Sequence, residues 1–205
     1  MAASSFSSPR DGAGWRTAGG RAIDRAAIRR HAADILFGSF TLDVPDRVLA
    51  EERLIPHATL ATMFPDGLSD VRVITLKGIA AAAMLRVPTR ASGGRANLHQ
   101  GAIGLGVDLA TGKTTRARLR GRAITTHPDS KAQLVDVQLP HWDEILDVAR
   151  RSAAAVPLGY LGVDVGIDAR RGPVVLEINK RPGLEIQNVN GFGLRPILEA
   201  IEAGS

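Results

Sequence analysis

Apolar side chains recur along this chain with two spacings, one typical of helices and one typical of strands. In residues 24–37 they return every three or four positions, between Asp24, a favourable N-cap, and Gly38, a common helix stop. The same spacing recurs in residues 141–156 and, over a shorter stretch, in residues 194–202. The sequence therefore predicts three helices.

Alternating patterns predict strands in the rest of the chain. Residues 70–78 and 81–89 form a predicted hairpin, and residues 160–168 and 173–179 form a second hairpin across the connection ARRG. Residues 45–57 predict a short strand that ends in charges, followed by a loop, and the glycine-dense residues 88–112 predict tight turns. This alternation predicts an α+β fold with a largely antiparallel sheet and flanking helices.

Composition limits the class of protein. The 205 residues include no cysteine, and no apolar run is long enough to span a membrane. The first twenty residues are small, polar and glycine-rich without an apolar signal core, so we expect residues 1–20 to be poorly ordered and residues 21–205 to form the domain. These features favour a cytoplasmic protein.

The net charge of +5 raises the question of nucleic-acid binding. Much of the excess comes from two clusters, Arg21, Arg25, Arg29 and Arg30, and Lys113, Arg116, Arg118, Arg120 and Arg122. Aromatic residues are few and are not interleaved with these cations, as they are in single-strand binders. A solvated basic surface is therefore the favoured interpretation, and nucleic acid is an unlikely partner.

The second hairpin gathers polar groups on one face. Alternation places Glu177 and Asn179 on the same side of their strand, with Leu176 and Ile178 facing a core. If Asp168 pairs with Pro173 across the turn, Asp164 lies opposite Glu177, with about 5 Å between their Cβ atoms. Two carboxylates and an amide oxygen form a hard ligand set suited to Mg²⁺.

Two alternatives weaken this metal hypothesis. Asp164 or Glu177 could instead form a structural salt bridge with Arg72 or Arg86 of the first hairpin. A slip of one residue in the register would also send the two carboxylates to opposite faces of the sheet.

The same segments resemble a known family. GYLGVDVGID (159–168) followed by GPVVLEINKRPGLEIQNVNGFGL (172–194) is similar to the end of an ATP-grasp domain, in the alpha-L-glutamate ligase-like, sugar-transfer-associated branch. SDVRVITLKG and LPHWDEIL extend the resemblance upstream, so that it covers roughly residues 47–200. It implies an ATP- and Mg²⁺- or Mn²⁺-dependent ligase that joins a carboxylate to an amine through an acyl phosphate.

The resemblance also implies roles for individual residues. It makes Asp164, Glu177 and Asn179 metal ligands, and it places Arg72, Arg86 and Arg181 near the transferred phosphate or an incoming carboxylate. Glu51 matches the strand that holds adenine, although Glu52 fits equally well, and the backbone near Arg53 and Leu54 would contact the same base. The implied substrate-side residues are Arg90, Asn97 and His99.

The beginning of the chain departs from the family pattern. Relatives carry an N-terminal subdomain, a strand with a phosphate-contacting lysine and a glycine-rich covering loop, and we expect this chain to lack the subdomain and part of the ATP lobe. A non-catalytic nucleotide-binding scaffold is therefore the first alternative. A basic nucleic-acid-binding module, which the two arginine clusters raise, is less favoured. The implied substrates are a small-molecule or peptide carboxylate and an amine, and homo-oligomer formation stays open.

Overall fold

The computed structural model describes residues 6–7, 15–17, 22–39 and 44–204 and divides the chain into two compact units, Met1–Arg53 and Leu54–Ser205. Most of residues 1–20, whose order the sequence addresses, lie outside the described residues. No helix in the described ranges is both long and apolar enough to cross a bilayer.

The first unit contains a small antiparallel sheet and one helix. Strands β1 (Phe6–Ser7), β2 (Trp15–Thr17) and β3 (Ala22–Ile23) pair in that order, and α1 (Arg25–Leu36) follows. The side chain of Asp24 accepts a hydrogen bond of 2.7 Å from the Ala27 amide, and Gly38 has a φ of +78°. The predicted cap, helix and stop are confirmed.

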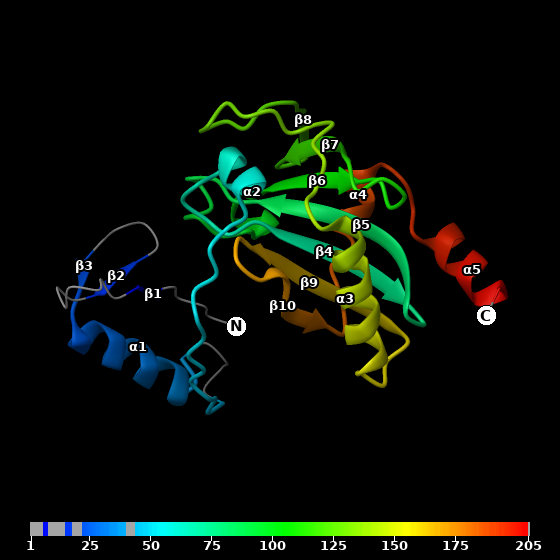
Figure 1. Cartoon of the computed structure of the whole chain (residues 1–205). Coiled ribbons are helices and arrows are strands. Elements are labelled where there is room, and N and C mark those ends of the chain that lie inside the picture. The colour runs from blue at the N-terminus through cyan, green and yellow to red at the C-terminus, as the bar shows by residue number, and fades with distance from the viewer. Residues whose placement is uncertain (1–5, 8–14, 18–21, 40–43, 205) are drawn as a thin grey trace. The chain divides into compact units, whose positions relative to one another are not determined.

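A seven-stranded sheet organises the second unit, and every neighbouring pair in it is antiparallel (Figure 1). The spatial order is β10-β9-β4-β5-β6-β7-β8. The strands are β4 (Asp70–Leu76), β5 (Ile79–Val87), β6 (Ile103–Val107), β7 (Thr114–Leu119), β8 (Arg122–Ile124), β9 (Tyr160–Asp168) and β10 (Gly172–Asn179). The predicted α+β fold is confirmed.

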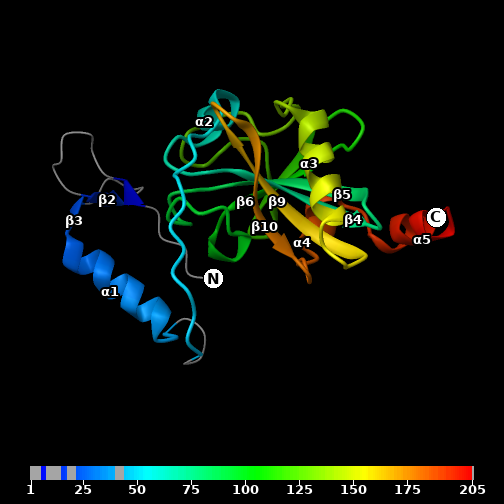
Figure 2. The same ribbon diagram turned by 60° about the horizontal axis from the view of Figure 1, so that its bottom comes forward.

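Helices cover both faces of this sheet (Figure 2). Alternate side chains such as Val71, Val73 and Val163 form the larger core, which includes α2 (Ala58–Met63) and α3 (Trp142–Ala154). On the opposite face, Ile74 and Met84 pack in a smaller cluster with α4 (Glu185–Asn190) and α5 (Arg195–Ala203). A sheet buried on both faces leaves room for a polar site only where the helices do not cover it.

One prediction about local structure is wrong, and several short elements were not predicted. Residues 44–55 form neither a helix nor a strand, and Pro56 makes one isolated bridge to Asp168. Prolines at both ends of the predicted strand lack the N–H that a ladder requires. The sequence patterns also did not predict α2, α4, β7, β8 and the short 3₁₀ helix Leu98–Gln100, because elements this short show little hydrophobic periodicity.

The register of the last hairpin differs from the expectation at its turn. Asp168 pairs with Gly172 rather than with Pro173. A bulge between Val175 and Glu177 then shifts the pairing by one residue, so that Glu177 still lies opposite Asp164. The extra residue, Leu176, is 40% exposed on the edge strand β10, so its predicted place in a core is wrong.

Candidate functional site

A buried network of charges joins neighbouring strands on the α4 and α5 face of the sheet. Arg72 on β4 donates to both carboxylate oxygens of Asp164 on β9, from Nε to Oδ1 and from Nη2 to Oδ2, each at 2.7 Å. Arg86 on β5 donates from Nη2 to the same Oδ2 at 2.7 Å. Asp164, which is only 2% exposed, is therefore shared by two guanidinium groups.

Asp70 completes the network and was missed by sequence reasoning. Its oxygens Oδ1 and Oδ2 accept from Nε and Nη2 of Arg86 at 2.6 and 2.8 Å. Asp70 and Arg86 are directly opposed in the β4–β5 register. The available signal was the spacing, because Asp70 lies two residues before Arg72 and therefore shares its face. Two carboxylates and two guanidinium groups give the network zero net charge.

Burial also affects the protonation of Asp70. Burial raises the pKa of Asp70 to about 6, against the lowering effect of Arg86. Burial by itself would lower the pKa of Arg86, but Asp70 and Asp164 together raise it. Arg86 therefore stays charged while Asp70 titrates.

This raised pKa predicts a pH-dependent stability. Because Asp70 binds a proton more tightly in the folded than in the unfolded state, its contribution is full below about pH 4 and is lost as the pH rises through about 6. Asp70→Asn removes this titration. We expect the difference in unfolding free energy between wild type and variant to change by about 3 kcal/mol at most across that window. Urea unfolding at several pH values measures it, and a difference independent of pH would contradict the prediction.

Two glycines on β9 let other segments approach on either side of Asp164. A Cβ at Gly162 would lie 2.6 Å from Cβ of Pro182, and one at Gly166 would lie 3.2 Å from Cδ1 of Leu54. The segment after Leu54 is held to the end of β9, since the Ile55 amide donates to Oδ2 of Asp168 at 2.7 Å. Pro182 and Leu54 therefore flank the buried carboxylate.

The three predicted metal ligands lie on the paired strands β9 and β10. Glu177 is exposed, directly opposite Asp164 in the register. Asn179 presents its amide nitrogen, which donates to Oδ2 of Asp164 at 3.2 Å. Within the described ranges, no group of three His, Cys, Asp or Glu side chains is arranged to hold a metal ion. The salt-bridge alternative is thus the arrangement that Asp164 adopts in this structure.

The other predicted residues are distributed more widely. Arg181 is exposed and immediately precedes Pro182. Asn97 caps the short 3₁₀ helix by accepting from the His99 amide at 3.0 Å, and the Arg90 amide donates to Asp129 at 2.8 Å. Glu51, Glu52 and Arg53 belong to the first unit, whereas Leu54 belongs to the second.

His99 lines a cavity of about 240 Å³ that the sequence did not predict. Arg118 and Arg120 from β7 and the turn that follows it also line this cavity, together with Glu185 at the start of α4. Arg118 and Arg120 of the second basic cluster therefore lie beside His99, which is one of the predicted substrate-side residues. Only the pairing of β6 with β7 produces this proximity, because some twenty positions of sequence separate the residues.

The antiparallel sheet thus carries a buried, neutral arginine–carboxylate network on an α+β scaffold. The chain belongs to the sugar-transfer associated ATP-grasp family, whose model matches residues 6–203. The family expectation is confirmed, and the match extends further towards the N-terminus than the quoted motifs do.

Curated relatives match shorter parts of the chain. A probable alpha-L-glutamate ligase of Maridesulfovibrio salexigens is 32% identical over 117 residues, which are 57% of this chain and 28% of the relative. A protein of the same description from Xanthomonas campestris pv. campestris is 59% identical over 39 residues, 19% of this chain and 13% of the relative. The chain thus matches less than a third of the length of either relative.

Solved structures show a weaker similarity. The ATP-grasp ligase PsnB complexed with a minimal precursor is 19% identical, with a TM-score of 0.37 over 67% of this chain and 35% of that chain. The PsnB complex with minimal precursor, Mg and ADP gives the same identity and TM-score over 66% and 33%.

Proposed function

We propose that this chain acts as an ATP- and Mg²⁺-dependent ligase that joins a carboxylate to an amine through an acyl phosphate. Membership of the ATP-grasp family supports this function. The observation that carries it is the buried network of Asp164, Arg72 and Arg86, which lies beside the exposed carboxylate of Glu177. Buried arginines that are positioned in advance favour the negative charge that develops when a phosphoryl group is transferred.

The proposed metal ligands are Asp164, Glu177 and Asn179. Their chemistry fits Mg²⁺, because two carboxylates and one amide oxygen are hard ligands that come from directly paired strands. Binding would require Asp164 to exchange part of its arginine contacts and the amide of Asn179 to present its oxygen. A bound Mg²⁺ would neutralise phosphate charge and orient the phosphates.

The arginines have distinct proposed roles. Arg72 and Arg86, released in part from Asp164, would donate to the oxygens of the transferred phosphoryl group. Arg181, exposed beside Pro182, would attract the incoming carboxylate. The substrate oxygen forms a bond to the γ-phosphorus as the bond to ADP breaks. The amine then displaces phosphate from the acyl carbon and loses a proton to solvent.

The remaining assignments concern adenine and the substrate. The backbone of Leu54 is a proposed adenine contact, since the Leu54 side chain packs beside Asp164 at Gly166. Glu51 or Glu52 and the backbone of Arg53, which belong to the first unit, stay predictions of adenine contact. Arg90, Asn97 and His99 are the proposed substrate-side residues, and the cations that share a cavity with His99 would suit a carboxylate substrate. That substrate is a small molecule or a peptide.

Titration calorimetry with Mg·ATP tests the metal site. Glu177→Gln removes the negative charge of one proposed ligand at an exposed position, so the fold should be preserved while the affinity falls about tenfold. Glu202→Gln on α5 is the matched control, because Glu202 is also exposed and lies on a different element. Equal affinity of the wild type and Glu177→Gln would contradict the proposed ligand set.

A nucleotide-binding scaffold is the second candidate, and one observation favours it. The network around Asp164 is neutral, and both carboxylate oxygens already accept hydrogen bonds. Release of phosphate from ATP in the presence of candidate acids and amines separates the two functions. Turnover above the buffer rate supports the ligase, and binding of ATP without turnover supports the scaffold.

A further inference from the structure

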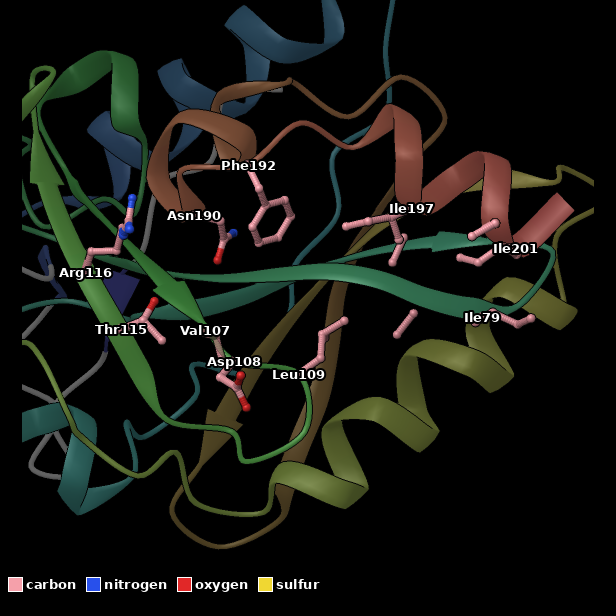
Figure 3. Close-up of a pocket in the computed structure, with 13 residues that line it drawn as sticks. Ile79, Val107, Asp108, Leu109, Thr115, Arg116, Asn190, Phe192, Ile197 and Ile201 are labelled. Atoms are coloured by element: carbon pink, nitrogen blue, oxygen red, sulfur yellow. The ribbon is translucent and has the colours of Figure 1, made fainter. Parts of the chain in front are cut away.

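A second cavity lies on the same face of the sheet, and the residues of the Asp164 network do not line it. It has a volume of about 650 Å³ and lies between the β4–β5 hairpin, β6, β7 and α5 (Figure 3). Ile79, Ile197 and Ile201 line one end, and polar side chains gather at the other. Cavities of this size and mixed lining commonly bind small ligands.

A β-bulge builds the polar end of this cavity. The register between β6 and β7 shifts between Gly106 and Val107, because Arg116 pairs with Gly106 while Thr114 pairs with Val107. Thr115 is the extra residue. Thr115 and Arg116 consequently both line the cavity, although neighbours on a regular strand would point to opposite faces.

Asn190 supplies an acceptor at the same end. It is 9% exposed, and its amide nitrogen donates to the carbonyl oxygens of Ala83 and Ile186, each at 3.0 Å. Because both N–H groups are used, the orientation of the amide is fixed, and its Oδ1 accepts no hydrogen bond from the described residues. A Cβ at Gly106 would lie 2.8 Å from this oxygen and 2.8 Å from Oγ1 of Thr115. The two oxygens therefore converge where Gly106 has no side chain.

Arg116 provides a cation that is available to a ligand. It is exposed and forms no ion pair with any residue that the structure describes. Its guanidinium lies against Gly191, where an added Cβ would overlap Nη1. Asp108 also lines the cavity, but its Oδ1 accepts from the amide and the hydroxyl of Thr111, each at 2.8 Å.

We infer that this cavity binds an apolar amino-acid residue that has a free carboxylate and an acylated nitrogen. The carboxylate would contact Arg116 and the hydroxyl of Thr115, and the N–H would donate to Oδ1 of Asn190. The apolar body would lie along the three isoleucines. This chemistry is shared by N-acyl amino acids and by the carboxyl end of a peptide.

The inferred site is separate from the Asp164 network. Met84 and Gly104 lie between Gly106 and Arg86 in the sheet register. The side chain of Val189 on α4 covers Gly104, and Met84 packs in the same cluster as Val189. A ligand in this cavity would therefore not contact Arg86, and its binding does not depend on the proposed ligase function.

Titration of the full chain, followed by amide NMR shifts, tests the inference without ATP. The probes are N-acetyl-L-leucine, N-decanoyl-L-leucine and an N-acetylated hexapeptide that ends in leucine, with N-decanoyl-L-leucinamide as the uncharged control. We expect shifts of the amide signals of Ile79, Gly106 and Phe192. The affinity for N-decanoyl-L-leucine should be at least about tenfold above that for N-decanoyl-L-leucinamide. If N-decanoyl-L-leucine binds more tightly than the hexapeptide, the preferred ligand is an N-acyl amino acid. If the hexapeptide binds more tightly, the preferred ligand is the carboxyl end of a peptide.

Variants with little expected effect on folding make the test specific. Arg116→Gln should weaken binding of the acids about tenfold and leave binding of the amide unchanged, and Thr115→Ala should weaken the acids by a smaller factor. Arg122→Gln, an exposed arginine on β8 outside the cavity, should change neither. The inference would be overturned if N-decanoyl-L-leucine and its amide bound with equal affinity, or if no acid bound up to about 1 mM. It would also be overturned if the shifts centred on Arg86, or if Arg116→Gln bound the acids as tightly as the wild type does.

Discussion

Asp164→Asn is expected to lower the free energy of unfolding by about 3 kcal/mol, because it leaves two buried guanidinium groups without their shared anion. Arg72 loses its only ion-pair partner among the described residues, and Arg86 retains Asp70 alone. The same variant should abolish binding of Mg·ATP if Asp164 is a metal ligand. Urea unfolding measures the first effect, and calorimetry on the folded variant measures the second.

Asp147→Asn is the matched control for this variant. Asp147 also contacts two arginines, Arg150 and Arg151, each at 2.7 Å, but its side chain on α3 is 46% exposed. Exposed ion pairs contribute little to stability because water screens them. The control should therefore unfold almost as the wild type does. Similar stability of both variants would show that burial of the Asp164 network has no energetic consequence.

Arg86→Gln is expected to cost about 3 to 5 kcal/mol at neutral pH, since it leaves Asp70 buried as an unpaired carboxylate. Burial already raises the pKa of Asp70 to about 6, and losing Arg86 should raise it further. The variant should accordingly recover part of its stability as the pH falls and Asp70 takes up a proton. Urea unfolding at pH 5 and at pH 7.5 measures this recovery.

Two further variants isolate the cause. The double variant Arg86→Gln/Asp70→Asn should be more stable at neutral pH than Arg86→Gln alone, because the unpaired charge is absent. Arg72→Gln should cost less than Arg86→Gln, since Asp164 keeps Arg86 as a partner. If Arg86→Gln showed no recovery at low pH and no gain from the second substitution, Asp70 would not be the group that destabilises it.

The sequence predicted the strands of the site better than their contacts. Alternation placed Glu177 and Asn179 on one face, and the Asp164–Glu177 pair is confirmed by the register. The predicted register at the turn was wrong, because the turn after Asp168 ends one residue earlier, at Gly172, and a bulge at Leu176 restores the pairing. A bulge leaves no reliable mark on the hydrophobic pattern, so two deviations of opposite effect could not be seen in the sequence.

The side-chain contacts that the sequence did not predict are contacts between different strands or between a strand and a helix. Asp70 has an evident position on its strand, but its pairing with Arg86 depends on the length of the Lys77–Gly78 turn and on a second bulge in β4–β5. The convergence of His99 with Arg118, and that of Thr115 with Asn190, depend on how β7 and α4 pack. Such neighbours are distant in sequence and share no periodic signal.

The sequence by itself determined the two hairpins, the three longer helices and the family, because periodicity and ordered motifs are local properties of the chain. The tertiary structure alone decided which charges share a face at close range. It placed Asp164 between Arg72 and Arg86, flanked by Pro182 and Leu54. It also formed the second cavity, whose polar end lies next to Gly106. The physical reason is that register, bulges and helix packing are set by the burial of whole faces, which no single segment contains.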